Sequence, residues 1–233
     1  LFLRYGRTNM ATLSGFFVFL SGGITNDYLG TSTTIATADT VLANGYTLQR
    51  GAQLTRPVNL AGYRNLRTFL TWSRPVPLIS SNLTLTGGLM YARTPGITNG
   101  IETRGDMYNV TSGAVIASNI SENFDFTLSY TANQNYLRNA VGIERNSDYF
   151  SHLGSIRVNW IFWEGLVLRG DLTHTLTNGL GEGYNQDFLL LNGSIGKKFF
   201  SDQSLEISLN VFDLLDRNKS AVRLATEAYV EDV

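Results

Sequence analysis

Apolar and polar side chains alternate along roughly ten separate stretches of this chain, which is the periodicity of a β-strand. In "SLEISLNVF", Leu205, Ile207 and Leu209 share one face, while Glu206 and Ser208 share the other. Successive side chains of a strand point to opposite faces of the sheet, so each stretch predicts a strand with one apolar and one polar face. Helical periodicity is almost absent, and the chain is therefore expected to be all-β.

The connections between the expected strands are of two alternating kinds. The strands are expected near residues 1–6, 12–25, 59–72, 82–93, 107–119, 124–136, 149–163, 165–177, 187–200 and 204–213. Short connections fall near 7–11, 73–81, 120–123, 163–165 and 201–203, and longer polar ones near 26–58, 94–106, 137–148, 178–186 and 214–233. Short turns at one end and long loops at the other are typical of a transmembrane antiparallel β-barrel, and a β-sandwich has no reason to sort its loops in this way.

Aromatic residues gather at both ends of the expected strands. Near the short turns lie Phe16, Phe17, Trp72, Phe124, Trp160, Trp163, Phe199 and Phe200. Near the long loops lie Tyr28, Tyr91, Tyr108, Tyr136, Tyr149 and Tyr184. Because Trp and Tyr favour the two membrane–water interfaces, this pattern predicts two aromatic belts. Enrichment of aromatic residues in any β-strand is the alternative explanation.

Composition narrows the class of protein further. Charged residues make up only 16% of the chain, compared with about 25% in soluble domains. The net charge of −1 gives no reason to expect a nucleic-acid partner. The absence of cysteine excludes disulfides and thiolate metal sites, and no apolar run approaches the length of a membrane helix.

The turn "WEG" at 163–165 predicts the register of one hairpin. Residues equally distant from this turn lie opposite each other, so Arg157 should face Asp171 and Asn159 should face Arg169. All four lie on the polar face. An arginine facing lipid at mid-depth would cost roughly 2–4 kcal/mol, so this face is expected to line an aqueous or plugged lumen.

The turn near 201–203 predicts a second register in the same way, with Lys198 opposite Glu206 and Ser194 opposite Asn210. Opposite charges in such cross-strand positions are modestly favourable. If a substrate touches this part of the protein, its candidate contacts are side chains on the polar face. These candidates are Arg157, Asn159, Arg169, Asp171 and Asn210. A role in stabilising the lumen or a plug is the other interpretation of each.

Longer motifs resemble a known family. The stretches "SENFDFTLSYTANQN", "NWIFWEGLVLRGDL", "GYNQDFLLLNGSIGKKFF" and "VFDLLDRNKS…TEAYVEDV" resemble the C-terminal half of the outer-membrane β-barrel family of Bacteroidota, which is related to TonB-dependent transporters. The resemblance runs from "LFLRYGRTNMATLSGFFVFLSG" almost to Val233. It implies that residues 1–233 are a partial transmembrane barrel domain, about ten strands of a barrel of about 22.

The resemblance also implies a function and partners. Such proteins lie in the cell outer membrane and import a scarce nutrient, with the siderophore, glycan and peptide classes unresolved. The implied partners are outer-membrane lipid, the protein's own plug, a TonB-type energising complex acting through an N-terminal part, and a surface lipoprotein. No cofactor is implied. The plug, the N-terminal domain and the last strand are expected to lie outside this chain, which stops at "YVEDV" rather than at an aromatic residue.

Other functions remain as alternatives. A self-contained small barrel could act as a passive pore, adhesin or structural anchor, and a soluble all-β module could bind glycans. An enzyme is not expected, because neither His152 nor His174 is placed for a catalytic triad. These two histidines are expected nearly opposite each other on the apolar face, with no acidic partner there, so a metal site is not expected either.

Overall fold

The protein forms one large antiparallel β-sheet, as its alternating sequence predicts. The computed structural model describes residues 1–42, 45–118, 120–139, 147–180, 185–200, 202–217, 223–225 and 230–232. The strands of the large sheet are β1 (Phe2–Asn9), β2 (Ser14–Thr25), β3 (Tyr28–Ile35), β6 (Gln53–Leu60), β7 (Tyr63–Val76), β8 (Ser81–Thr98), β9 (Ile101–Ser118), β10 (Phe124–Asn139), β11 (Ser147–Phe162), β12 (Leu166–Asn178), β13 (Gln186–Phe199) and β14 (Leu205–Val211). The smaller elements are β4 (Thr40–Val41), β5 (Thr47–Leu48), the 3-10 helix η1 (Pro77–Ile79), β15 (Arg223–Ala225) and β16 (Val230–Asp232). The all-β prediction is confirmed.

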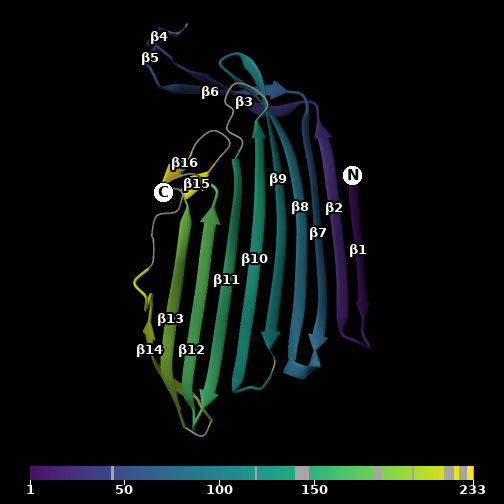
Figure 1. The fold of residues 1–233 in the computed structure, drawn as a ribbon, viewed down its shortest axis with the longest axis vertical. Helices are drawn as coiled ribbons and strands as arrows, with labels where there is room; N and C mark the ends of the chain where they lie inside the picture. The colour runs from purple at the N-terminus through teal and green to yellow at the C-terminus, as the bar shows by residue number, and fades with distance from the viewer. Residues whose placement is uncertain are drawn as a thin grey trace.

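Ten strands lie side by side in the order β1-β2-β7-β8-β9-β10-β11-β12-β13-β14, each antiparallel to its neighbours (Figure 1). Two further pairs, β4 with β5 and β15 with β16, form separate small sheets. Within the described residues the large sheet is open, because β1 and β14 are its two end strands and do not pair with each other. The described residues contain no helix that is both long and apolar enough to cross a membrane.

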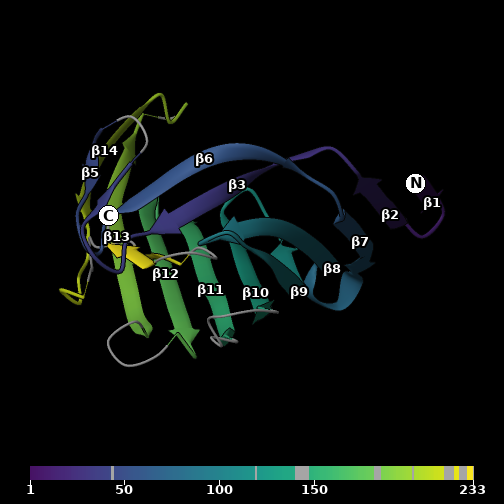
Figure 2. The same cartoon turned by 90° about the horizontal axis from the view of Figure 1, so that it is seen from above.

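The sheet is curved, and its polar face is the concave one. Seen from above, the strands follow an arc, with β3 and β6 running across its hollow side (Figure 2). Two contacts with this hairpin identify the face that looks into the hollow. The rings of Tyr28 on β3 and Tyr63 on β7 stack with centroids 4.4 Å apart. A Cβ built at Gly96 on β8 would point toward the carbonyl oxygen of Thr31 on β3, 3.7 Å away. Side chains that share the face of Tyr63 and Gly96 therefore point into the hollow.

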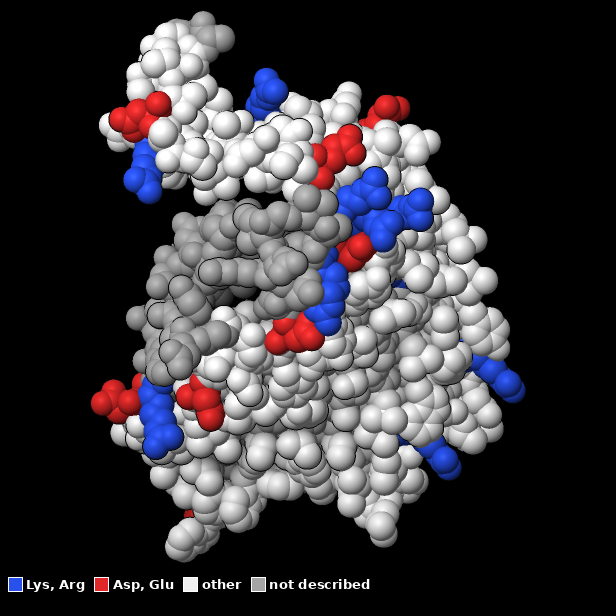
Figure 3. Space-filling view, turned by 45° about the horizontal axis from the view of Figure 1, so that its top comes forward, with Lys and Arg blue, Asp and Glu red and all other residues white. Residues whose placement is uncertain are grey.

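The convex face is apolar and is not covered by a second layer of the described chain. Its central aliphatic side chains remain well exposed, for example Leu128 at 41%, Ile156 at 44% and Ile195 at 51%. Among the described residues only Ala36 and Val167 are buried hydrophobic side chains. A broad area without charged side chains lies below a group of charges at one end of the molecule (Figure 3). The aliphatic rows therefore do not meet another sheet, as they would in a β-sandwich.

The segment 26–58, expected as a long loop, contains most of a second hairpin. Strands β3 and β6 pair along their whole lengths, and β3 also pairs in parallel with the end of β8 at Ile97 and Thr98. The backbone N–H of Ile35 donates to Asn99 Oδ1 at 2.7 Å, which ties the hairpin to the β8–β9 turn. The expectation of an irregular loop was wrong, because backbone pairing at the edge of the sheet compensates for the weak alternation of this segment.

The expectation of a long loop at 94–106 was also wrong. Strands β8 and β9 continue through it and are joined only by Asn99 and Gly100, both at positive φ (51° and 80°). Two central residues at positive φ define a type I′ turn, whose twist matches that of the flanking strands. The Asn-Gly pair was the sequence signal for this tight hairpin.

Candidate functional site: the polar concave face

The two predicted registers place the candidate residues on neighbouring strands of the concave face. Arg157 lies opposite Asp171, and Asn159 lies opposite Arg169, as the "WEG" turn predicted. Arg157 Nε donates to Asp171 Oδ2 at 3.1 Å. The other oxygen of Asp171 accepts from Thr173 Oγ1 at 3.2 Å. The register prediction for this hairpin is confirmed, and one of its two pairs is an ion pair.

The second predicted register is confirmed as well, but the ion pair that forms there involves a different strand. Lys198 lies opposite Glu206, and Ser194 opposite Asn210. Glu206 instead accepts from Arg169, through Nη1 to Oε1 at 2.5 Å and Nη2 to Oε2 at 3.0 Å. This fork-like pair joins β12 to β14 across β13, because the small residues at this level of β13 leave room for the long side chains.

Asn159 and its neighbours complete the charged part of the face. Asn159 Nδ2 donates to Asp125 Oδ2 on β10 at 3.1 Å. Asn159 Oδ1 and Ser194 Oγ are buried without a hydrogen-bond partner among the described atoms. Buried polar atoms of this kind are normally satisfied by protein groups or by ordered water. Sequence reasoning missed Asp125 as the partner of Asn159 and Glu206 as the partner of Arg169, although the alternation of their strands already placed both carboxylates on the polar face.

From β8 to β13 the concave face becomes neutral nearer the long loops, whereas β7 places Arg67 at the level of Asn109. Asn109 Nδ2 donates to Asn135 Oδ1 at 2.8 Å, and Thr111 Oγ1 is shared between Asn109 Oδ1 at 2.9 Å and Asn133 Oδ1 at 2.8 Å. The face therefore has an ionic part near the short turns and an amide- and hydroxyl-rich part near the loops. Most of the candidate charges are satisfied by each other, which suits a hydrophilic wall better than a preformed charged binding site.

The convex face ends in a row of tyrosines and then in charges. Tyr91, Tyr108 and Tyr136 lie in register on adjacent strands, and the rings of Tyr91 and Tyr108 are 4.9 Å apart. One step beyond them, at the loop end and outside the apolar band, Arg93 Nε donates to Asp106 Oδ1 at 2.7 Å. Hydrogen bonding from Arg93, with a further hydrogen bond from Tyr91, lowers the pKa of Asp106 below its ordinary value.

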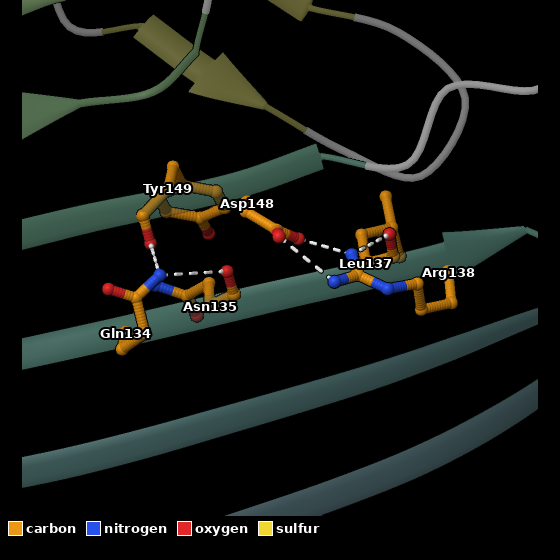
Figure 4. A network of polar contacts seen from close by, with 6 residues as sticks. All are labelled: Gln134, Asn135, Leu137, Arg138, Asp148 and Tyr149. Atoms are coloured by element: carbon orange, nitrogen blue, oxygen red, sulfur yellow. Dashed lines mark hydrogen bonds and ion pairs between the residues drawn. The ribbon is translucent and has the colours of Figure 1, made fainter.

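The neighbouring rim pair is Arg138 and Asp148, joined through both carboxylate oxygens (Figure 4). At the same loop end of β10 and β11, Gln134 Nε2 donates to the carbonyl of Tyr149 at 3.3 Å. Tyr149 itself does not join the tyrosine row, because it pairs with Asn135 on the concave face. Its assignment to an aromatic belt was therefore wrong. The same holds for Tyr28, whose ring stacks on Tyr63 in the hollow, and for Phe17, which pairs with Thr71 on the concave face. Tyr184 lies outside the described residues.

The Asp106→Asn variant should show how much the Arg93–Asp106 pair contributes to the free energy of unfolding. A depressed folded-state pKa means that ionised Asp106 stabilises the protein above the ordinary pKa of an aspartate, and that this contribution disappears as the pH falls through the lowered value. We expect the variant to lose about 1 kcal/mol or less at neutral pH, because the pair is partly exposed to solvent, and to match the parent in acid. Urea titrations at several pH values measure this difference. A difference that does not depend on pH would contradict the assignment.

The histidines lie on the convex face, and one expectation about them is corrected. His152 Nε2 and His174 Nδ1 are 2.9 Å apart. His174 Nε2 lies 2.8 Å from Asp187 Oδ1, so an acidic partner is present on this face. It was missed because the register between β12 and β13 crosses a long loop. In the described part of the chain, no group of three or more His, Cys, Asp or Glu side chains is placed to hold a metal ion.

Comparisons with known proteins gave no relative for the chain. No family model matches it. No curated protein and no solved structure matches it either. Functional inference therefore rests on the two faces of the sheet and on the motifs of the sequence.

Proposed function

We propose that the chain forms part of the wall of a transmembrane barrel in the bacterial outer membrane, and that this barrel belongs to a TonB-dependent-type nutrient transporter. The observation that carries the proposal is the convex face: an apolar band exposed on one side of a single sheet whose other side is polar. Soluble proteins rarely leave so large an apolar surface uncovered, whereas a lipid-facing strand alternates in this way.

The order of side chains along the convex face supports the membrane assignment. On β11, Trp160 and His152 stand at the two ends of the apolar residues of this face and lie eight positions apart, which corresponds to a height of about 20 Å for a tilted strand, close to the hydrocarbon band of such barrels. Lys197 lies near the short turns and donates to the carbonyl of Glu164 at 2.7 Å. Its charge thus lies near the end of the band, as an interfacial lysine does.

The two open edges support a larger barrel. Sheet edges are not viable in hydrocarbon, because their backbone donors and acceptors have no partners there. The self-contained small barrel would require β1 to pair with β14, yet these are the end strands of the described sheet. Further strands of the same protein would close the barrel, in agreement with the resemblance to transporters of about 22 strands.

The concave face suits a lumen that holds a plug. Its ionic half, around Arg157, Asp171, Arg169 and Glu206, lies toward the short turns. Arg157 keeps 71% of its side chain exposed, so it can contact a plug or a passing solute while it remains paired with Asp171. From β8 to β13 the amide- and hydroxyl-rich part faces the long loops, where cargo would enter. The cargo class stays open among siderophores, glycans and peptides.

The proposal is tested on the full-length gene. We expect its product to fractionate with the outer membrane and to change its migration on SDS gels after heating, as folded barrels do. A deletion strain should lose growth on one member of a panel of iron chelates, oligosaccharides and peptides supplied as the limiting nutrient, and the same growth should fail when the energising complex is inactivated. Outer-membrane location with unchanged uptake of every nutrient would contradict the transport function, and a water-soluble product would contradict the barrel.

A further inference from the structure

Four polar side chains form a hydrogen-bonded row on the convex face, one from each of four neighbouring strands. Tyr130 Oη lies 3.4 Å from His152 Nδ1. His152 Nε2 lies 2.9 Å from His174 Nδ1. His174 Nε2 lies 2.8 Å from Asp187 Oδ1. The wall of a transporter barrel does not require such a row, because the surrounding positions on this face are filled by leucine, glycine and alanine.

When both imidazoles are neutral, the Asp187 carboxylate sets the direction of every hydrogen bond in the row. The Asp187 carboxylate can only accept, so His174 donates from Nε2 and, as a neutral ring, presents an unprotonated Nδ1. His152 then donates from Nε2 to that nitrogen and presents its own Nδ1 to the hydroxyl of Tyr130. The centre of the row is therefore a pair of imidazole nitrogens that share a single proton.

We propose that His152 Nε2 and His174 Nδ1 chelate one divalent transition-metal ion, with Cu(II) as the preferred ion. Two imidazole nitrogens in adjacent positions of a tetragonal complex, at metal–nitrogen distances of about 2.0 Å, are about 2.9 Å apart. The two nitrogens lie 2.9 Å apart, at the length of the hydrogen bond that joins them, so a bridging ion would replace that hydrogen bond at nearly the same spacing. A tetrahedral Zn(II) site would hold them farther apart, and Cu(II) also binds nitrogen ligands more tightly than Zn(II) does.

The outer ends of the row provide the partners that metal-binding histidines use. A ligating histidine almost always donates its second ring N–H to a carboxylate or another oxygen, which fixes its tautomer. Asp187 fills this role for His174, and Tyr130 fills it for His152. On metal binding the His152 proton moves from Nε2 to Nδ1 and Tyr130 becomes the acceptor, so the net charge of the four side chains does not change. A modest rotation of each ring about χ2, a torsion with broad preferences, lets the two lone pairs converge.

The site is open to the solution on one side. Asp187 is the second residue of β13, at the loop end of the strand, and its side chain is 69% exposed, while that of His174 is 39% exposed. Because the described chain supplies only two ligating nitrogens here, water or a ligand from outside completes the coordination. The proposal depends on the geometry of β10–β13 and not on transport.

The test uses the full-length protein in detergent, titrated with copper(II) sulfate and, separately, with zinc chloride. We expect a Cu(II) electron paramagnetic resonance signal with coupling to two imidazole nitrogens. His152→Phe and His174→Phe should each lose one equivalent of bound copper. Asp187→Asn should bind copper about 10- to 100-fold more weakly, because it disturbs only the orientation of His174. Asn178→Ala, on the same face of β12 and outside the row, is the matched control and should bind copper as the parent does.

Retention of the full copper equivalent by either histidine variant would overturn the proposal. Heat-modified migration on SDS gels shows whether each variant is folded. A second measurement needs no variant: diethyl pyrocarbonate modifies free imidazoles, and bound Cu(II) should protect His152 and His174 from it in the parent, as read by mass spectrometry. Equal modification with and without copper would likewise overturn the site. Neither result bears on nutrient uptake, so failure here is separate from failure of the transport function.

Discussion

Arginine in place of Leu128 is expected to lower the free energy of unfolding of the membrane-inserted protein by about 2–4 kcal/mol. Leu128 lies on the convex face of β10, four positions from Phe124 and eight from Tyr136, well inside the apolar band. A guanidinium there must either leave water for hydrocarbon or distort the bilayer to reach the interface. The measurement is a urea titration of the full-length protein refolded into lipid vesicles, followed by tryptophan fluorescence.

The matched control is Thr131→Arg, three positions along the same strand. Thr131 faces the concave side, where it pairs with Gly113 and Leu153. Because a charge on this side stays hydrated, the control should change stability by only about 0.5 kcal/mol. Equal losses in the two variants would show that both faces of β10 are in similar surroundings, and the membrane assignment would then fail.

The second large loss of stability is expected from a substitution in the turn between β11 and β12. Gly165 has φ of 92° and follows Trp163 and Glu164, which also have positive φ. Its carbonyl accepts from Lys198 N at 2.7 Å, and a Cβ added to it would lie 3.1 Å from the carbonyl oxygen of Lys198. Gly165→Ala therefore combines left-handed strain with a backbone clash, and we expect it to lower the free energy of unfolding by about 2–4 kcal/mol.

Alanine variants of two other glycines separate the cost of backbone strain from the cost of the contact with Lys198. Gly100 has φ of 80° but no atom within 4 Å of an added Cβ, so Gly100→Ala should cost only the strain, about 1–2 kcal/mol. Gly170 lies within β12 with open space around it, and Gly170→Ala should be neutral or slightly stabilising. Urea titrations of the three variants should give this order. A cost at Gly165 no larger than that at Gly100 would rule out the contact with β13.

The parts of the fold that the sequence predicted are those fixed by local geometry. The alternation indicated the strands, and the turn at Trp163–Gly165 fixed the pairing of Arg157 with Asp171, because a tight turn leaves no freedom in register. The second turn fixed Lys198 opposite Glu206 for the same reason. Facing and register could therefore be derived from residue numbers alone.

The parts that escaped prediction depend on contacts between strands that no tight turn connects. Arg169 bonds to Glu206 across an intervening strand, so its partner becomes known only once the order of the sheet is known. Asp187 comes beside His174 through a register set across a long loop. The hairpin of β3 and β6 forms where Gly30 and Pro57 interrupt the alternation, and it is held by backbone pairing that the side-chain pattern does not record.

The two end strands have a practical consequence for anyone who handles this polypeptide alone. Within the described residues, each presents an unpaired row of backbone donors and acceptors, and β14 adds exposed Ile207 and Leu209 beside that row. Such an edge can pair with a strand of another chain, and in a pure preparation that chain is a second copy of the same polypeptide. If the proposed barrel contains further strands, the polypeptide produced without them should stack edge to edge into fibrils or inclusion bodies, and soluble yield should return when those strands are supplied.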